Sequence, residues 1–365
     1  MDVAGILIPL IVAGALAALL TPSVGRLATA LGVVDRPSAR SVAHRANIPL
    51  LGGLAVAAGF AAGLAAALWL LAPEVSISHL GGMTVGGIVI LAVGVWDDRA
   101  SLSPWTKLAG QVVAAVVAIS AGFQMGHITE PVSRQTIFLS EPVAWLASLV
   151  WIVGITNAMN LIDGLDGLAT GVGAIICGTL TVILIQAGQP FGVCLGVALL
   201  GGLLGFLPHN FPPARIFLGD TGALFMGYML ALLSLEGYRQ VTVITFVVPL
   251  LTLAIPLLDT ALSIVRRART GHSPFRADRM HLHHRLLAAR GSARPAVLQF
   301  YFLTACFSLI AVSFTDLEGY VAAGCLAVVL ILTLRMLSNL GVFSLTAEDD
   351  IATQDAGAGV EKESR

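Results

Sequence analysis

The chain has 365 residues, of which 57% are hydrophobic and only 11% are charged, and its mean hydropathy is +0.90. This composition lies outside the range of soluble globular proteins, so the sequence predicts an all-α, polytopic integral membrane protein. The net charge of −1 hides a strong spatial asymmetry, and it argues neither for nor against a nucleic-acid partner.

Long apolar segments recur along the chain. A bilayer core about 30 Å thick requires roughly 20 apolar residues per helix, and on this measure about 11 segments qualify. Their approximate centres are Ile11, Ala62, Ile88, Val116, Val150, Ile176, Leu199, Met229, Leu250, Leu303 and Val328. We expect residues 1–340 to form the transmembrane domain and the polar, acidic residues 341–365 to form a disordered tail.

The basic residues predict the orientation of these segments. Of the 20 lysine and arginine residues, only Arg134 and Arg239 fall outside one alternating set of loops. Since basic residues are retained on the cytoplasmic side, the amino terminus is predicted outside the cell and the carboxyl terminus in the cytoplasm. Every inner carboxylate before the tail is then an aspartate.

The third apolar segment ends in two adjacent carboxylates, Asp97 and Asp98, at the depth of the headgroup phosphates. Neighbouring residues on a helix point about 100° apart, so one carboxylate could face a site while the other supports it. The alternative is an interfacial stop that merely ends the helix.

Residues 157–167 carry two amides and two acids in an apolar context. On a helix, Asn157, Asn160 and Asp163 share one broad face. Asp166 would leave that face, but the glycines at 164 and 167 allow the backbone to turn and bring both aspartates toward one ligand. A helix cap is the alternative for one aspartate, although it leaves the other three polar residues unexplained.

Asp220 stands in the sequence Phe-Leu-Gly-Asp-Thr-Gly at the start of the eighth apolar segment. Backbone N–H groups at a helix start favour phosphate, and a carboxylate beside them can hold the magnesium ion that accompanies it. The alternative is that Asp220 simply caps the helix.

The longest inner loop follows the ninth segment and combines three histidines with several arginines. A zinc site is one interpretation, but no nearby cysteine or glutamate completes a ligand set. The interleaved arginines favour a phosphate or nucleotide partner, and a lipid-headgroup contact is the alternative.

These motifs occur together in one known family. Asp97-Asp98 with Lys107-Leu-Ala-Gly-Gln111, the block 157–168, the block 217–222 and Asp278-Arg-Met-His-Leu-His-His284 follow one another in this order. In this respect the chain resembles the polyprenyl-phosphate N-acetylhexosamine-1-phosphate transferases, the WecA and TagO branch of the glycosyltransferase 4 type, related to MraY. The resemblance covers about residues 1–340 and includes His44 in the first inner loop.

The resemblance implies an enzyme that transfers an N-acetylhexosamine 1-phosphate, most simply GlcNAc 1-phosphate, from a UDP-sugar to undecaprenyl or another polyprenyl phosphate. UMP is released, in the first membrane step of cell-envelope polysaccharide synthesis. The resemblance also implies Mg²⁺, with Mn²⁺ as a substitute, and a place in the inner (plasma) membrane with the active site facing the cytoplasm. The implied partners are the UDP-sugar, the lipid phosphate and the bilayer, without nucleic acid, and a homodimer is a candidate assembly.

The resemblance also implies residue roles. Asp220 is the first choice as metal ligand, with Asp163 beside it. The catalytic residues would be Asp97, Asp98, Asp163 and Asp166, and the first two would position or deprotonate the lipid phosphate. The substrate-binding residues would be Lys107, Asn157, Asn160, Asp259, His281, His283, His284, Arg285 and His44.

Three alternatives stay open. A relative in the same family could use another donor, such as UDP-MurNAc-pentapeptide. An ion-coupled transporter would also contain intramembrane acids, but its coupling residues belong near the bilayer midplane, whereas these acids sit at helix ends. A CDP-alcohol phosphatidyltransferase also has an Asp-Gly pair, but its motif continues through Ala-Arg, and here Asp166-Gly-Leu-Ala is followed by Thr170.

Overall fold

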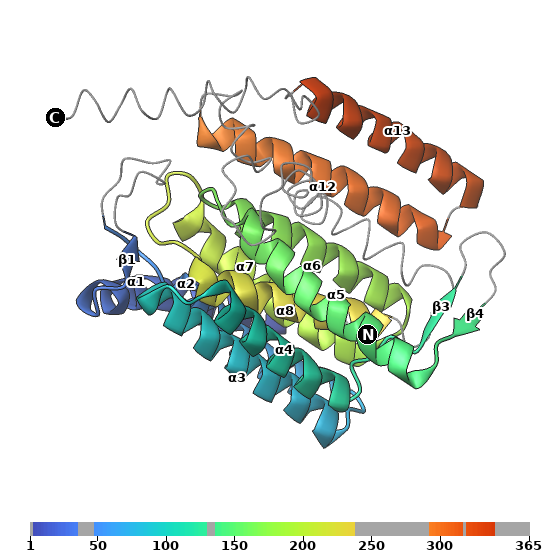
Figure 1. Cartoon of the computed structure of the whole chain (residues 1–365), viewed down its shortest axis with the longest axis horizontal. Coiled ribbons are helices and arrows are strands. Elements are labelled where there is room, and N and C mark those ends of the chain that lie inside the picture. Colours follow the sequence, from blue (N-terminus) through green and yellow to red (C-terminus); the bar gives the residue numbers. More distant parts are fainter. Residues whose placement is uncertain (1–2, 36–46, 130–135, 238–291, 317–318, 340–365) are drawn as a thin grey trace.

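The structure is a computed structural model that describes residues 3–35, 47–129, 136–237, 292–316 and 319–339. These residues are mostly helical, and the helices run roughly along one common direction (Figure 1). The described helices are α1 Val3–Ala30, α2 Gly52–Leu71, α3 Ile77–Ala100, α4 Pro104–Ser120, α5 Glu141–Ile162, α6 Leu168–Gln186, α7 Pro190–Asn210, α8 Gly219–Gly237, α12 Ala293–Asp316 and α13 Gly319–Asn339.

Two short antiparallel hairpins were not predicted. One pairs β1, Val34–Asp35, with β2, Ile48–Pro49, and the other pairs β3, His127–Thr129, with β4, Thr136–Phe138. Each strand has two or three residues, so the periodicity of the sequence carries almost no signal for it. The prediction of an all-α chain therefore holds for the membrane helices and misses these loop elements.

Helix α8 lies at the centre of the bundle. All its residues from Thr221 to Glu236 are buried, because α8 packs against α2, α3, α5 and α6. Contacts between α8 and its neighbours are close: a Cβ on Gly94 of α3 would lie 2.4 Å from the Cα of Thr221. The helices packed around α8 therefore fix the position of its first turn, which carries Asp220.

The opposite end of α8 contains a buried ion pair. Glu236 and His79, at the start of α3, lie 2.6 Å apart with side chains 4% and 3% exposed. The other ring nitrogen of His79 lies 2.9 Å from the Ala121 carbonyl, and the ring stacks on Phe123. A carbonyl oxygen only accepts, so Nδ1 of His79 must donate this hydrogen bond. The pair thereby ties the end of α8 to α3 and to the end of α4.

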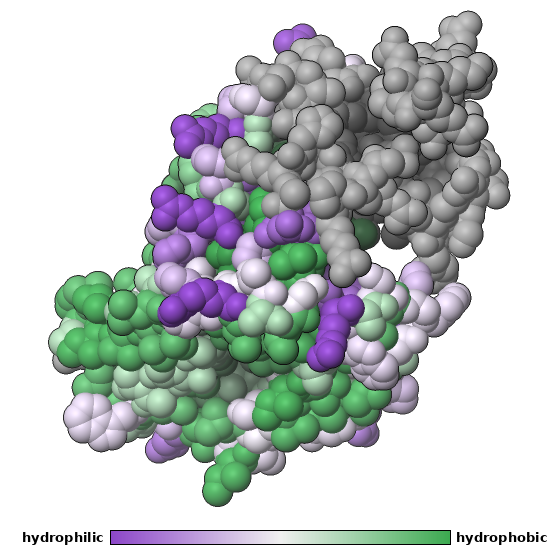
Figure 2. Space-filling model, turned by 90° about the vertical axis from the view of Figure 1, so that its left-hand side faces the viewer, coloured by the Kyte–Doolittle hydropathy of each residue, from purple (hydrophilic) through white to green (hydrophobic). Residues whose placement is uncertain are grey.

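The outer surface of the bundle suits a bilayer. Seven described helices, namely α1, α2, α3, α5, α6, α7 and the part of α12 up to Val312, are long and apolar enough to cross a membrane. Large apolar side chains face outward, as with Leu19 (74% exposed) on α1 and Leu309 (69%) on α12. Figure 2 shows extensive hydrophobic surface in the lower part of one view, with hydrophilic side chains above it. The chain is thus a multi-pass membrane protein.

The predicted spans can be compared with these helices one by one. Among the described residues, every predicted centre lies inside a helix, although α4 has only 17 residues. The ninth centre, Leu250, lies outside the described residues, as do the predicted tail 341–365 and the largest inner loop. The count of eleven crossings and the orientation of the termini stay predictions.

Candidate functional site

The site is built around the first turn of α8. The segment before this helix pairs with the entry to α2: the N–H of Phe217 donates to the Pro49 carbonyl at 2.9 Å, and the N–H of Gly53 donates to the Leu218 carbonyl at 2.9 Å. Gly219 then adopts φ 72°, a left-handed conformation that glycine adopts without steric cost. These contacts fix the direction in which Asp220 enters the bundle.

Asp98 caps α8 from the neighbouring helix α3. Its Oδ1 accepts from the N–H of Asp220 at 2.8 Å, and its Oδ2 accepts from the N–H and the hydroxyl of Thr221 at 3.1 and 2.6 Å. A Cβ on Gly219 would lie 2.6 Å from Oδ2 of Asp98, so the glycine also makes room for this carboxylate. The capping role considered for Asp220 therefore belongs to Asp98, which satisfies free N–H groups at the helix start.

The Asp220 carboxylate itself connects three helices. Lys107 of α4 donates to its Oδ2 at 3.1 Å, and the side-chain amide of Asn160 on α5 donates to its Oδ1. Asp220 retains 31% exposure of its side chain, so a ligand can reach it. The sequence prediction that Asp220, Asn160 and Lys107 act in one site is consistent with this placement, while their roles stay predictions.

Lys107 is shared between two carboxylates. Its ammonium lies 2.5 Å from Oδ2 of Asp97, which is only 5% exposed, as well as 3.1 Å from Asp220. The other oxygen of Asp97 accepts from the N–H of Leu102 at 2.6 Å and so closes the turn between α3 and α4. Asp97 and Asp98 thus make different contacts, as expected of side chains about 100° apart on a helix: Asp97 contacts Lys107, and Asp98 contacts the start of α8. The catalytic roles predicted for both stay predictions.

Asp163 ends α5 and faces the other acids. Gly167, with φ 71°, makes the turn into α6, whereas Gly164 does not adopt a positive φ. Burial raises the pKa of the Asp163 carboxyl well above its usual range, and the negative charge of Asp220 raises it further, followed by that of Asp98 and Asp166. Among the described residues, no group donates a hydrogen bond to the Asp163 carboxylate.

Asp166 lies on the same turn but has a partner. Its Oδ2 accepts from the N–H of Ala214 at 2.9 Å, in the loop between α7 and α8. This hydrogen bond connects the α5–α6 turn to the segment that leads into α8. Neither aspartate caps α6, whose N-cap is Gly167 without a side-chain hydrogen bond, so the capping alternative does not apply to this helix.

The donor set suits a hard divalent cation. Lys107 contacts the carboxylates of Asp97 and Asp220, and the Asp163 carboxyl lies close enough to Asp220, Asp98 and Asp166 to be affected by their charges. The described residues contain no ready-made group of three metal-binding side chains. Magnesium commonly takes one or two carboxylates and completes its shell with substrate phosphates and water, so Asp163 and Asp220 fit such an ion.

Asn157 and Gln111 form a bridge between α5 and α4. The Asn157 amide donates to Oε1 of Gln111 and, at 3.0 Å, to the Val153 carbonyl, while Gln111 donates back at 3.3 Å. Gln111 is buried and was not assigned a role from the sequence, although its place one helical turn after Lys107 was a usable signal. The substrate-binding role of Asn157 stays a prediction, because its amide is already engaged.

Several predicted residues cannot be placed. Those that lie outside the described residues are Asp259, His281, His283, His284, Arg285 and His44.

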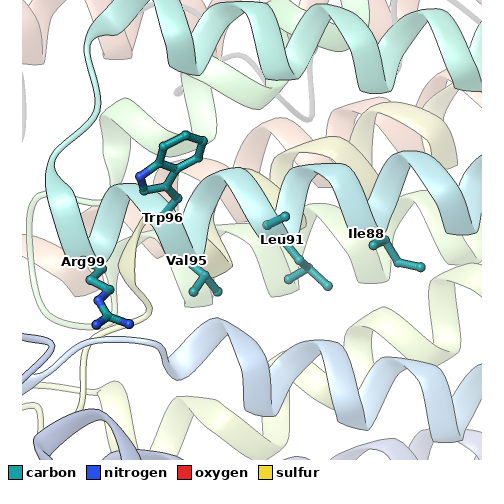
Figure 3. A pocket seen from close by; sticks show the side chains of 6 residues that line it. Ile88, Leu91, Val95, Trp96 and Arg99 are labelled. Carbon is teal, nitrogen blue, oxygen red and sulfur yellow. The ribbon is translucent and has the colours of Figure 1, made fainter. Parts of the chain in front are cut away.

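A groove of about 540 Å³ runs along α3, away from this charged cluster. Figure 3 shows Ile88, Leu91, Val95 and Arg99 along one side of the helix. Ile88 is 60% exposed and Trp96 is 59% exposed, as expected of side chains that face lipid. Arg99 projects about 200° around the helix from Asp97, so the groove does not belong to the aspartate site.

Comparison with known proteins gives consistent matches. The family model described as glycosyl transferase family 4 matches residues 80–238. The probable undecaprenyl-phosphate N-acetylglucosaminyl 1-phosphate transferase of Bacillus subtilis (strain 168) is 38% identical over 301 residues, 80% of this chain and 80% of that protein. The chain belongs to glycosyl transferase family 4.

Other family members are similar to different extents. The decaprenyl-phosphate N-acetylglucosaminephosphotransferase of Mycolicibacterium smegmatis is 38% identical and covers 75% of this chain and 73% of that protein. The phospho-N-acetylmuramoyl-pentapeptide-transferase of Limosilactobacillus reuteri (strain DSM 20016) is 36% identical but covers 53% of this chain and 62% of that protein. The resemblance drawn from the motifs is thereby confirmed, and the whole aspartate cluster lies within the family match.

Proposed function

We propose that this protein transfers N-acetylglucosamine 1-phosphate from UDP-N-acetylglucosamine to a polyprenyl phosphate, such as undecaprenyl phosphate, and releases UMP. The reaction would begin the synthesis of a cell-envelope polysaccharide. The relatives named for N-acetylglucosamine transfer match three quarters or more of the chain, and this favours the same donor here. The structural observation that carries the proposal is the placement of Asp220 between Lys107 and Asn160, with Asp163 close enough to be affected by its charge.

The reaction joins two anions, and the site must offset their repulsion. An oxygen of the lipid phosphate forms a bond to the β-phosphorus of the UDP-sugar. The bond from that phosphorus to the oxygen shared with the α-phosphorus breaks, and UMP leaves with the electron pair. Mg²⁺ or Mn²⁺, held by Asp220 and Asp163, would supply charge stabilisation at the diphosphate. A preorganised cation at Lys107 stabilises the same developing charge.

The contacts support positioning roles for Asp97 and Asp98. Asp97 orients Lys107, so that the ammonium can reach a phosphate oxygen without losing its position. Asp98 holds the N–H groups of Asp220 and Thr221 with both oxygens and therefore acts as a positioning residue. His281, His283, His284 and Arg285 would bind the phosphates of the nucleotide sugar, and His44 and Asp259 would complete the substrate site.

The end of the bundle that carries the aspartates would lie on the cytoplasmic side of the inner membrane, where UDP-sugars are available. The distribution of basic residues supports this orientation. Single cysteines at Pro213, beside the aspartates, and at Gly188, at the other end of α6, should react with a membrane-impermeant reagent from opposite sides of the membrane. Labelling of both positions from the outside would contradict the orientation.

The choice of donor is tested with the purified protein, undecaprenyl phosphate and Mg²⁺. UDP-N-acetylglucosamine should release UMP, and UDP-MurNAc-pentapeptide should release little. The second donor is the main competitor, since transferases with that name also match part of the chain. UMP release from UDP-MurNAc-pentapeptide alone would move the protein to the other branch of its family.

A further inference from the structure

Helix α12 reaches the turn that carries Asp163. The hydroxyl of Tyr301 donates to the carbonyl of Gly167, the residue directly after Asp166. The ring packs against α6 so closely that a Cβ on Gly171 would lie 2.0 Å from it. The same Gly167 carbonyl accepts the first hydrogen bond of α6, from Gly171 at 3.0 Å. Tyr301 therefore fixes Gly167, which lies between Asp166 and the first residue of α6.

A second hydrogen bond from α12 reaches the α7–α8 loop, which contacts Asp166. Nε of Arg294 donates to the Pro212 carbonyl at 2.7 Å. Pro212 belongs to the α7–α8 loop, in which the N–H of Ala214 donates to Asp166 at 2.9 Å. The two side chains of α12 thus contact the turn after Asp166 and the loop that binds Asp166.

When the Asp163 carboxyl is ionised, the neighbouring carboxylates repel the turn that carries it. Asp163 faces the negative charges of Asp220 and Asp98 and has no cationic partner among the described residues. Repulsion between Asp163 on this turn and Asp220 on α8 favours movement of the turn away from α8, unless other contacts oppose that movement. Tyr301 and Arg294 oppose it from a helix that contributes no carboxylate to the cluster.

We propose that Tyr301 and Arg294 are positioning residues that hold the Asp163–Gly167 turn against α8 and so set the affinity of the site for a divalent cation. The inference rests on the proposed function, because it takes Asp163 and Asp220 as the metal-binding pair. Both side chains would act through the backbone of the turn and of the α7–α8 loop, to whose carbonyls they donate hydrogen bonds.

The test compares Tyr301→Phe with Tyr228→Phe in the full-length, detergent-solubilised protein. Tyr228 is a matched control: it is fully buried on α8, and its hydroxyl has no hydrogen-bond partner among the described residues. Mn²⁺ binding in the presence of UDP, measured by EPR, should weaken about 5- to 10-fold in Tyr301→Phe, the loss expected for one buried hydrogen bond. Tyr228→Phe should bind Mn²⁺ as the wild type does.

A second readout separates positioning from general stability. The Mg²⁺ concentration for half-maximal UMP release should rise in Tyr301→Phe, and excess Mg²⁺ should restore kcat. Arg294→Lys, which keeps the charge but lacks the Nε donor, should shift the same way by a smaller factor. An unchanged Mn²⁺ Kd in Tyr301→Phe, even with a lower Tm, would overturn the inference alone. Absence of Mn²⁺ binding in the wild type would overturn the proposed metal pair as well.

Discussion

Asp98 and Asp220 are in contact, yet they use their carboxylates differently. Asp98 directs both oxygens to N–H and hydroxyl groups at the start of α8, and Asp220 directs its oxygens to side chains of α4 and α5. A carboxylate that accepts several backbone hydrogen bonds stabilises the fold. A carboxylate that remains partly exposed can bind a metal ion.

This difference predicts that substitution of Asp98 mainly lowers stability, whereas substitution of Asp220 mainly lowers the rate. Asp98→Ala should lower the free energy of unfolding by about 1–2 kcal/mol, since the helix loses its cap. Asp220→Asn should lower the unfolding free energy less than Asp98→Ala, since asparagine keeps the size of the side chain and a carbonyl acceptor. It should lower kcat about 100-fold or more, since a charge that stabilises the transition state is lost. Thermal unfolding and UMP release, measured on the same preparations, check both effects. Wild-type stability of Asp98→Ala, together with a wild-type rate of Asp220→Asn, would mean that the roles are assigned incorrectly.

At the scale of elements, α8 is held at both ends by residues of α3. Asp98 contacts its first turn, and His79 forms the buried pair with Glu236 at its last turn. A helix of 19 residues is about 28 Å long at 1.5 Å per residue, so the two contacts are far apart. The ion pair should therefore support the fold without affecting the metal site directly.

Glu236→Ala tests this separation. Loss of one partner leaves a polar ring buried, so the free energy of unfolding should fall by about 3 kcal/mol, and Glu236→Gln should cost less because it keeps a hydrogen bond. The Mg²⁺ concentration for half-maximal activity should stay at the wild-type value in both variants. A shift of that concentration as large as the one expected for Tyr301→Phe would show that the two ends of α8 are coupled.

The sequence predicts elements better than it predicts their contacts. Apolar length locates the helices, and the positions of the aspartates at helix ends place them at one end of the bundle. The partners of those aspartates come from distant parts of the chain: Asp98 and Asp220 are 122 residues apart, and Tyr301 and Gly167 are 134 apart. Helical periodicity gives the direction of a side chain on its own helix, but it does not show which neighbour packs there.

For the whole molecule, these contacts make one end of a membrane-embedded bundle into a charged site. The turns α3–α4 and α5–α6 and the start of α8 meet there, and α12 fixes the α5–α6 turn from the side. The remaining surface of the bundle is largely apolar and suits a lipid environment. A site at a helix end, and not at the bilayer midplane, fits a reaction between a lipid phosphate at the headgroup level and a water-soluble nucleotide sugar.

In the proposed reaction a sugar 1-phosphate, and not the sugar alone, moves to the lipid. UDP-N-acetylglucosamine labelled with ³²P in its β-phosphate tests it, with purified protein, undecaprenyl phosphate and Mg²⁺. The label should enter the lipid fraction, the released UMP should be unlabelled, and Asp220→Asn should slow the transfer about 100-fold or more. Label that stays in the aqueous phase as UDP, while the sugar appears on the lipid, would show that the sugar moves without its phosphate.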